Sequence, residues 1–121
     1  MIGLKFPLLF SGNSSRIKAS KIARTIAEQE AIDYRVRLET RQADLLLLLN
    51  KYDQMLDYYQ EEGQNLSREI FDTANYSFEN GEINFFQYLQ SIENALDILI
   101  EYMENLNRYN QTAIELNYLT L

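Results

Sequence analysis

The chain has 121 residues, of which 46% are hydrophobic, four are Gly and one is Pro, which suits a single folded helical domain or a piece of one. It contains neither Cys nor His, so disulfides, thiol chemistry and nucleophilic sites built on a Ser–His or Cys–His pair are excluded. The same absence argues against zinc sites and against di-iron bundles, which normally use histidine. The net charge of −7 argues against nucleic acid as a partner.

The charges are unevenly distributed along the chain. Residues 1–51 carry nine basic and five acidic side chains, whereas residues 52–121 carry two basic and thirteen acidic ones. The acidic end either maintains solubility or attracts cations or a basic partner. No run reaches the roughly 18 apolar residues of a membrane-spanning helix. Residues 1–10 are not predicted to be a signal peptide, because Lys5 and Pro7 interrupt them and no small-residue cleavage site follows.

Residues 1–12 are predicted to form a short isolated β-strand or extended segment. Apolar side chains recur there with the period of two that marks a strand with one apolar face. Pro7 cannot donate a ladder hydrogen bond and would place such a strand at a sheet edge. The alternating residues are Ile2, Leu4, Phe6, Leu8 and Phe10.

A long helix is predicted over residues 13–79. Ser14 and Ser15 offer N-caps, and apolar residues then recur in alternating steps of four and three, the spacing of a coiled-coil seam. Gly63 interrupts this pattern and is the expected position of a kink, because glycine is unfavourable inside a helix. The seam continues beyond it to the end of the helix. Its members are Ala27, Ala31, Tyr34, Leu38, Arg41, Leu45, Leu48, Tyr52, Met55, Tyr59, Leu66, Ile70, Ala74 and Phe78.

A tight reversal is predicted at residues 80–84. Gly81 after Asn80 is a strong helix stop, because glycine accepts the left-handed conformation of a C-terminal cap. Asn84 can then cap the next helix, with Gln87 three residues on reaching back to complete a capping box. The two helices that flank this tip should therefore lie antiparallel.

The returning helix, residues 84–119, carries two apolar stripes. We take the first as its main packing seam: Phe85, Leu89, Ile92, Leu96, Leu99, Met103 and Leu106, continued by Asn110, Ala113 and Asn117. The second runs beside it: Tyr88, Ala95, Ile98, Tyr102, Tyr109 and Leu116. Two adjacent stripes predict packing against more than one neighbour, as in a bundle.

These elements predict an all-α fold, a long antiparallel helical hairpin of coiled-coil type. At about 1.5 Å per residue the returning helix is too short to cover the first one beyond about Leu45. Residues 14–43 therefore lack a partner within the chain, and self-association is expected. Neighbouring carboxylates lie in helical patterns where a solvated face is the default, so we expect no catalytic, cofactor or metal site.

Three motifs resemble the TolC-like outer-membrane efflux protein family. Residues 3–12, Gly-Leu-Lys-Phe-Pro-Leu-Leu-Phe-Ser-Gly, are similar to the family's final membrane strand. Ala74, Phe78, Gly81 and Leu89 match the spacing of its hairpin tip, where the second position is usually Tyr. Residues 109–116 resemble its returning helix. The matches follow in order at fitting distances and cover nearly the whole chain, which would be the later part of the second repeat.

The resemblance implies a trimeric channel of the outer membrane whose helical hairpins continue as a periplasmic tunnel. The tip would dock a periplasmic adaptor protein that is linked to an inner-membrane efflux pump. The sequence at the tip is most similar to heavy-metal efflux channels, including channel segments fused to their pumps. The residues assigned to the adaptor contact are Phe78, Asn80, Gly81, Glu82, Ile83, Asn84 and Phe85.

The sequence also departs from the family. Some members close the channel with an Arg and Asp residues just after the tip, where this chain has Ile83, Gln87 and Gln90, so no ionic lock is implied. Phe78 in place of Tyr removes a hydroxyl that could bond across the tip. The alternative interpretation is a cytoplasmic coiled-coil module for protein–protein interaction. An enzyme would need a polar pocket between the two helices.

Overall fold

The computed structural model describes the backbone of residues 6–121, with side chains from Gly12 onward. The described chain is an all-α helical hairpin, as predicted, and its described residues form no strand. Its elements are α1 (Phe6–Tyr58), a π-helical turn η2 (Tyr59–Gly63), α2 (Gln64–Glu79) and α3 (Phe85–Thr120). The chain divides into two units, residues 1–41 and 42–121.

The prediction of a strand or extended segment over residues 1–12 is wrong from Phe6 onward. Helix α1 begins at Phe6, so Phe6–Phe10 are helical and continue directly into the predicted long helix. A lone strand leaves its backbone donors and acceptors without partners, whereas a helix pairs them within the segment. Pro7 lies in the first turn, where its missing N–H is not needed. Residues 1–5 lie outside the described part of the chain.

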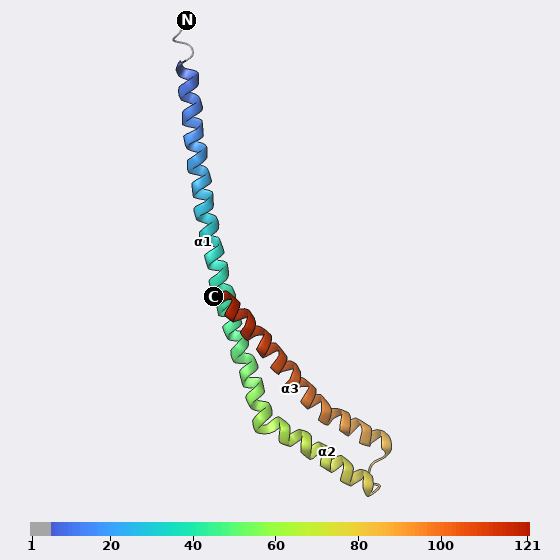
Figure 1. Cartoon of the computed structure of the whole chain (residues 1–121). Helices are drawn as coiled ribbons and strands as arrows, with labels where there is room; N and C mark the ends of the chain where they lie inside the picture. The colour runs from blue at the N-terminus through green and yellow to red at the C-terminus, as the bar shows by residue number, and fades with distance from the viewer. Residues whose placement is uncertain (1–5) are drawn as a thin grey trace. The chain divides into compact units, whose positions relative to one another are not determined.

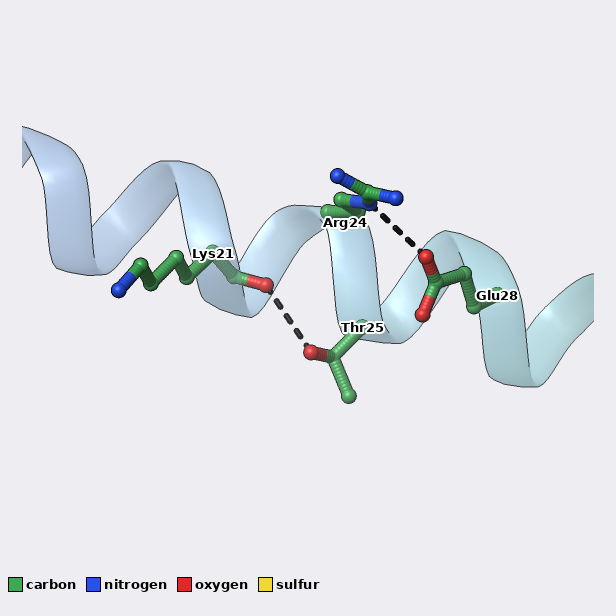
Figure 2. A network of polar contacts seen from close by, with 4 residues as sticks. All are labelled: Lys21, Arg24, Thr25 and Glu28. Atoms are coloured by element: carbon green, nitrogen blue, oxygen red, sulfur yellow. Dashed lines mark hydrogen bonds and ion pairs between the residues drawn. The ribbon is translucent and has the colours of Figure 1, made fainter.

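The first unit is the N-terminal part of α1 up to Arg41. Residues 12–37 are all exposed, as expected for a segment beyond the reach of the returning helix. Its side chains pair locally (Figure 2): Arg24 Nε lies 2.9 Å from Glu28 Oε1, and the Thr25 hydroxyl donates to the Lys21 carbonyl at 3.0 Å. Exposed pairs four residues apart each stabilise a helix by only a few tenths of a kcal/mol.

The second unit contains the hairpin. Figure 1 shows α2 and α3 running antiparallel and joined by the short tip. Two cross-helix hydrogen bonds set their register. The Tyr88 hydroxyl donates to Asn75 Oδ1 at 2.9 Å, and about two turns farther from the tip the Ser67 hydroxyl donates to the Ala95 carbonyl at 2.7 Å. A side chain as short as Ser reaching the opposite backbone shows that the two helices approach closely here.

The π-helical turn lies at the predicted position of the kink. The Gln64 N–H bonds the Tyr59 carbonyl five residues earlier, and the chain changes direction here in Figure 1. Gly63 keeps a helical conformation and is buried. A Cβ at Gly63 would lie 3.0 Å from Tyr59 Cδ2 and 3.6 Å from Ile98 Cγ2. The glycine therefore makes room for the Tyr59 ring, which stacks on Tyr102 with centroids 4.1 Å apart.

The register continues along α1 beyond the π-helical turn. One heptad before Tyr59, Tyr52 is half-buried, and one heptad before that Leu45 is buried, which is the spacing of a seam that continues along α1. Leu45 is only 1% exposed, which no isolated helix could achieve. The expectation that the returning helix covers α1 back to about Leu45 is therefore confirmed. The buried residues of the unit are Leu45, Leu56, Gly63, Ala74, Ala95 and Thr112.

The predicted seam of the first arm is approximately right. Leu45 and Tyr52 pack as expected, and Leu38 and Leu48 are half-buried. Leu56 is buried in place of Met55, which is 37% exposed.

On the returning helix the two stripes exchange roles. The second stripe, with Ala95 and Tyr102, packs against the first arm, whereas the main predicted seam is largely exposed. Small residues favour this choice, because Ala95 lets the backbone of α3 come within hydrogen-bonding distance of Ser67, closer than a leucine would allow. The seam residues left exposed are Phe85, Leu89, Leu96, Leu99, Met103 and Leu106, with Ile92 half-buried.

Candidate functional site

The hairpin tip is held first by backbone hydrogen bonds that end α2. Gly81 has φ +71°, the left-handed conformation that its sequence predicts. Its N–H bonds the Phe78 carbonyl at 3.0 Å, and the Glu82 N–H bonds the Ser77 carbonyl at 2.8 Å. This pair of bonds is a Schellman motif. The Asn80 side-chain amide adds a bond to the Tyr76 carbonyl at 2.7 Å, so the carbonyls of Tyr76, Ser77 and Phe78 are all paired.

A capping box begins α3, as predicted from the sequence. Asn84 Oδ1 accepts from the Gln87 N–H at 2.9 Å, and Gln87 Oε1 accepts from the Asn84 N–H at 3.0 Å. The tip is thus fixed on both sides by bonds that involve the backbone. Only Ile83 lies between the two capping motifs.

An aromatic cluster joins the two helices directly behind the tip. Phe78 stacks on Tyr88 with centroids 4.7 Å apart and meets Phe85 at 6.2 Å with tilted rings. Phe78 has no hydroxyl with which to bond across the tip. The bond between the two helices is made instead by the Tyr88 hydroxyl of α3, which donates to Asn75 of α2. We conclude that the reversal is braced by side chains as well as by backbone.

The predicted contact residues are brought together at this end of the hairpin. Phe85 is 62% exposed and Phe78 39%, whereas Ile83 is half-buried. Phe86, which sequence reasoning did not include, is 73% exposed and adds a second large apolar surface. The sequence feature that predicts its exposure is the Phe85-Phe86 pair in the first turn of α3, because two successive residues of a helix cannot both face α2. The remaining predicted residues, all exposed, are Asn80, Gly81, Glu82 and Asn84.

Away from the tip, a concavity with aromatic side chains in its wall lies beside η2. It has a volume of about 340 Å³ and combines residues of α1, η2 and α3. Its polar groups include Lys51 and Glu101, and Tyr59 and Tyr102 form part of its wall. Across residues 6–121, no three acidic, histidine or cysteine side chains come close enough to hold a metal ion.

Comparisons with protein-family models, curated proteins and solved structures find no match to this chain. Within the described residues, none of the helices combines the length and hydropathy required to cross a membrane. The site must therefore be interpreted from its own chemistry. That chemistry is an apolar, acidic-edged tip on a braced hairpin, which is suited to contact with another protein.

Proposed function

We propose that this chain is part of an outer-membrane efflux channel of the TolC-like type, and that its hairpin tip docks a periplasmic adaptor. The observation that carries the proposal is the braced tip, which holds Phe85 and Phe86 exposed at a fixed turn. A preorganised contact surface binds with less loss of conformational entropy than a mobile loop. The chain acts as a structural and docking element and has no catalytic role.

The same proposal gives the hairpin a cellular location and a set of partners. The adaptor links the channel to an inner-membrane pump, and the hairpin belongs to the periplasmic part of an outer-membrane protein. Exposed apolar side chains on the first unit, such as Ile22 and Ile26, are then covered by neighbouring protomers, three in the complete channel.

Binding of a periplasmic adaptor hairpin from the same genome tests the tip directly. Glu82→Arg and Phe86→Ala should each weaken the binding measured by biolayer interferometry by roughly tenfold, the effect of losing one contact worth about 1.4 kcal/mol. Asp53→Arg makes the same charge change on exposed α1 and should leave binding unchanged. Equal affinities of the Glu82→Arg, Phe86→Ala and unaltered chains would refute docking at the tip.

A second function is favoured by one observation. Residues Phe6–Phe10 are helical, which suits a cytoplasmic coiled-coil interaction module better than the end of a barrel strand. Subcellular fractionation separates the two. The channel requires the full protein in the outer-membrane fraction, and the coiled-coil module requires it in the cytoplasm.

A further inference from the structure

Asn80 is the one asparagine of this chain that precedes a glycine. Asparagine is a chemically labile residue, because the backbone nitrogen of the next residue can attack its side-chain carbonyl carbon. A following glycine favours this attack, since glycine has no Cβ to shield its nitrogen and gives the backbone freedom to reach the required conformation. Asn80 is exposed at the hairpin tip, so water has access to it. The sequence at the tip therefore has the residues needed for spontaneous deamidation.

The reaction has two balanced steps. In the first, the Gly81 nitrogen loses its proton to a base from solvent and bonds to Asn80 Cγ, while the bond from Cγ to Nδ2 breaks and the amide leaves as ammonia. The product is a five-membered succinimide ring. In the second step one water opens the ring, and cleavage at Cγ gives aspartate, whereas cleavage at the backbone carbonyl carbon gives isoaspartate. Both products carry a carboxyl group that is ionised at neutral pH.

The closed tip blocks the first step in three ways. The Asn80 backbone has φ −84° and ψ 0°, and at this ψ the Gly81 nitrogen eclipses the Asn80 nitrogen. It is therefore rotated away from Cβ by about a third of a turn and cannot reach Cγ. The Gly81 N–H donates to the Phe78 carbonyl at 3.0 Å, which holds the proton that the attacking nitrogen must lose. Asn80 Nδ2 donates to the Tyr76 carbonyl at 2.7 Å, which holds the side chain back along α2.

We propose that Asn80 is a latent deamidation site, protected while the tip is closed and modified when the cap of α2 opens. The opening breaks the Schellman bonds of Gly81 and Glu82, because these bonds hold the backbone at Asn80 in its unreactive conformation. Such a local opening does not require the rest of the hairpin to unfold. The inference does not depend on adaptor docking, since it concerns the covalent chemistry of the free tip.

Deamidation would make the opening irreversible. An aspartate at position 80 cannot donate to the Tyr76 carbonyl, because an ionised carboxylate only accepts hydrogen bonds. Its charge would lie at the C-terminal end of α2, where the helix dipole disfavours an anion, and between Glu79 and Glu82 in the sequence. An isoaspartate adds one atom to the main chain before Gly81, so the register of the Schellman bonds is lost. Each product therefore destabilises the closed tip.

Peptide mapping by mass spectrometry measures the reaction at Asn80. The full chain is incubated at mildly alkaline pH, folded in buffer or denatured in guanidinium chloride. Deamidation of Asn80 should be at least about tenfold slower in the folded chain, because only the open tip reacts. Gly81→Ala should slow the reaction in the denatured chain, since the added Cβ shields the attacking nitrogen.

Amide hydrogen exchange gives an independent measure of the same opening. The Gly81 N–H exchanges only when its bond to the Phe78 carbonyl is broken. Every conformation that can form the succinimide has also broken this bond. Folding should therefore slow deamidation at least as much as it slows exchange of the Gly81 N–H.

Two aromatic substitutions locate the opening at the tip. Phe78→Ala removes the ring that stacks on Tyr88 but keeps the backbone carbonyl that accepts from Gly81. It should loosen the tip and accelerate deamidation of the folded chain by at least about threefold. Tyr118→Ala is the matched control, because it removes an exposed ring near the opposite end of α3, and it should leave the rate unchanged. Circular dichroism checks that both variants retain their helices.

Four results would overturn the proposal. Equal rates in the folded and denatured chain would show that the closed tip gives no protection, and absence of reaction in the denatured chain would show that Asn80 is not a latent site. An undiminished rate in denatured Gly81→Ala would show that the Gly81 nitrogen is not the attacking atom. Equal rates in folded Phe78→Ala and the unaltered folded chain would show that opening of the tip does not control the reaction.

Discussion

Replacing Gly81 by Ala isolates the backbone conformation of the hairpin tip. Gly81 has φ +71°, and no atom lies within 4 Å of the position that a Cβ would take. The new methyl group therefore meets no neighbour, and both Schellman hydrogen bonds remain possible. The whole effect on the free energy of unfolding comes from holding an L-residue in the left-handed region, offset by the lower entropy of the unfolded chain.

The two contributions can be compared. The left-handed conformation costs an alanine roughly 1–2 kcal/mol relative to the right-handed one. Replacing Gly by Ala stabilises by about 0.4–1 kcal/mol through the unfolded state. We therefore expect Gly81→Ala to lower the free energy of unfolding of the hairpin by about 1 kcal/mol. For a unit of this size the melting temperature should fall by roughly 4–8 °C per kcal/mol.

Urea titration of the full chain, with amide hydrogen exchange to assign the loss to α2 and α3, measures this effect. Gly81→Asn is the matched control, because asparagine tolerates the left-handed region better than alanine and should lose less stability. Unchanged stability of Gly81→Ala would refute the reasoning, and so would an Asn variant less stable than the Ala variant.

Two further perturbations examine the braces between the helices. Tyr88→Phe removes the 2.9 Å hydrogen bond to Asn75 while keeping the ring stack. Urea titration should show that the free energy of unfolding falls by about 0.5–1.5 kcal/mol. An unchanged free energy of unfolding would mean that water replaces the bond fully. Gly63→Leu forces a side chain against Tyr59 and Ile98, and the same titration should show a loss of about 1–3 kcal/mol together with a weaker near-ultraviolet tyrosine signal. An unchanged tyrosine signal in that variant would contradict the assigned role of Gly63 in seating the stack.

The tip was the most predictable part of the molecule, because its causes are local. A glycine after Asn80 and an Asn84–Gln87 pair specify their conformations within a few residues, and the structure has both. The interruption near Gly63 was predictable for the same reason. Its π-helical form was not, since the extra residue in the turn is supported by the Tyr59–Tyr102 stack across the hairpin.

The choice of packing face could not be read from hydrophobicity alone. Both stripes of α3 are apolar, and the stripe with more large aliphatic side chains was predicted to be the packing seam. The close approach of Ser67 to Ala95 instead favours the stripe with small side chains, a property of both helices together. The N-terminal prediction failed at Phe6–Phe10 because periodicity gives no information on whether a strand has a neighbour to pair with.

The hydrogen bonds and ring contacts that hold the tip do not involve the side chains of Glu82 and Phe86. The Schellman motif uses the backbone N–H groups of Gly81 and Glu82, so the Glu82 side chain takes no part in it. Phe86 is similarly absent from the Phe78–Tyr88 stack. Substitutions at these two positions could change the specificity of recognition while the architecture that presents them is inherited intact.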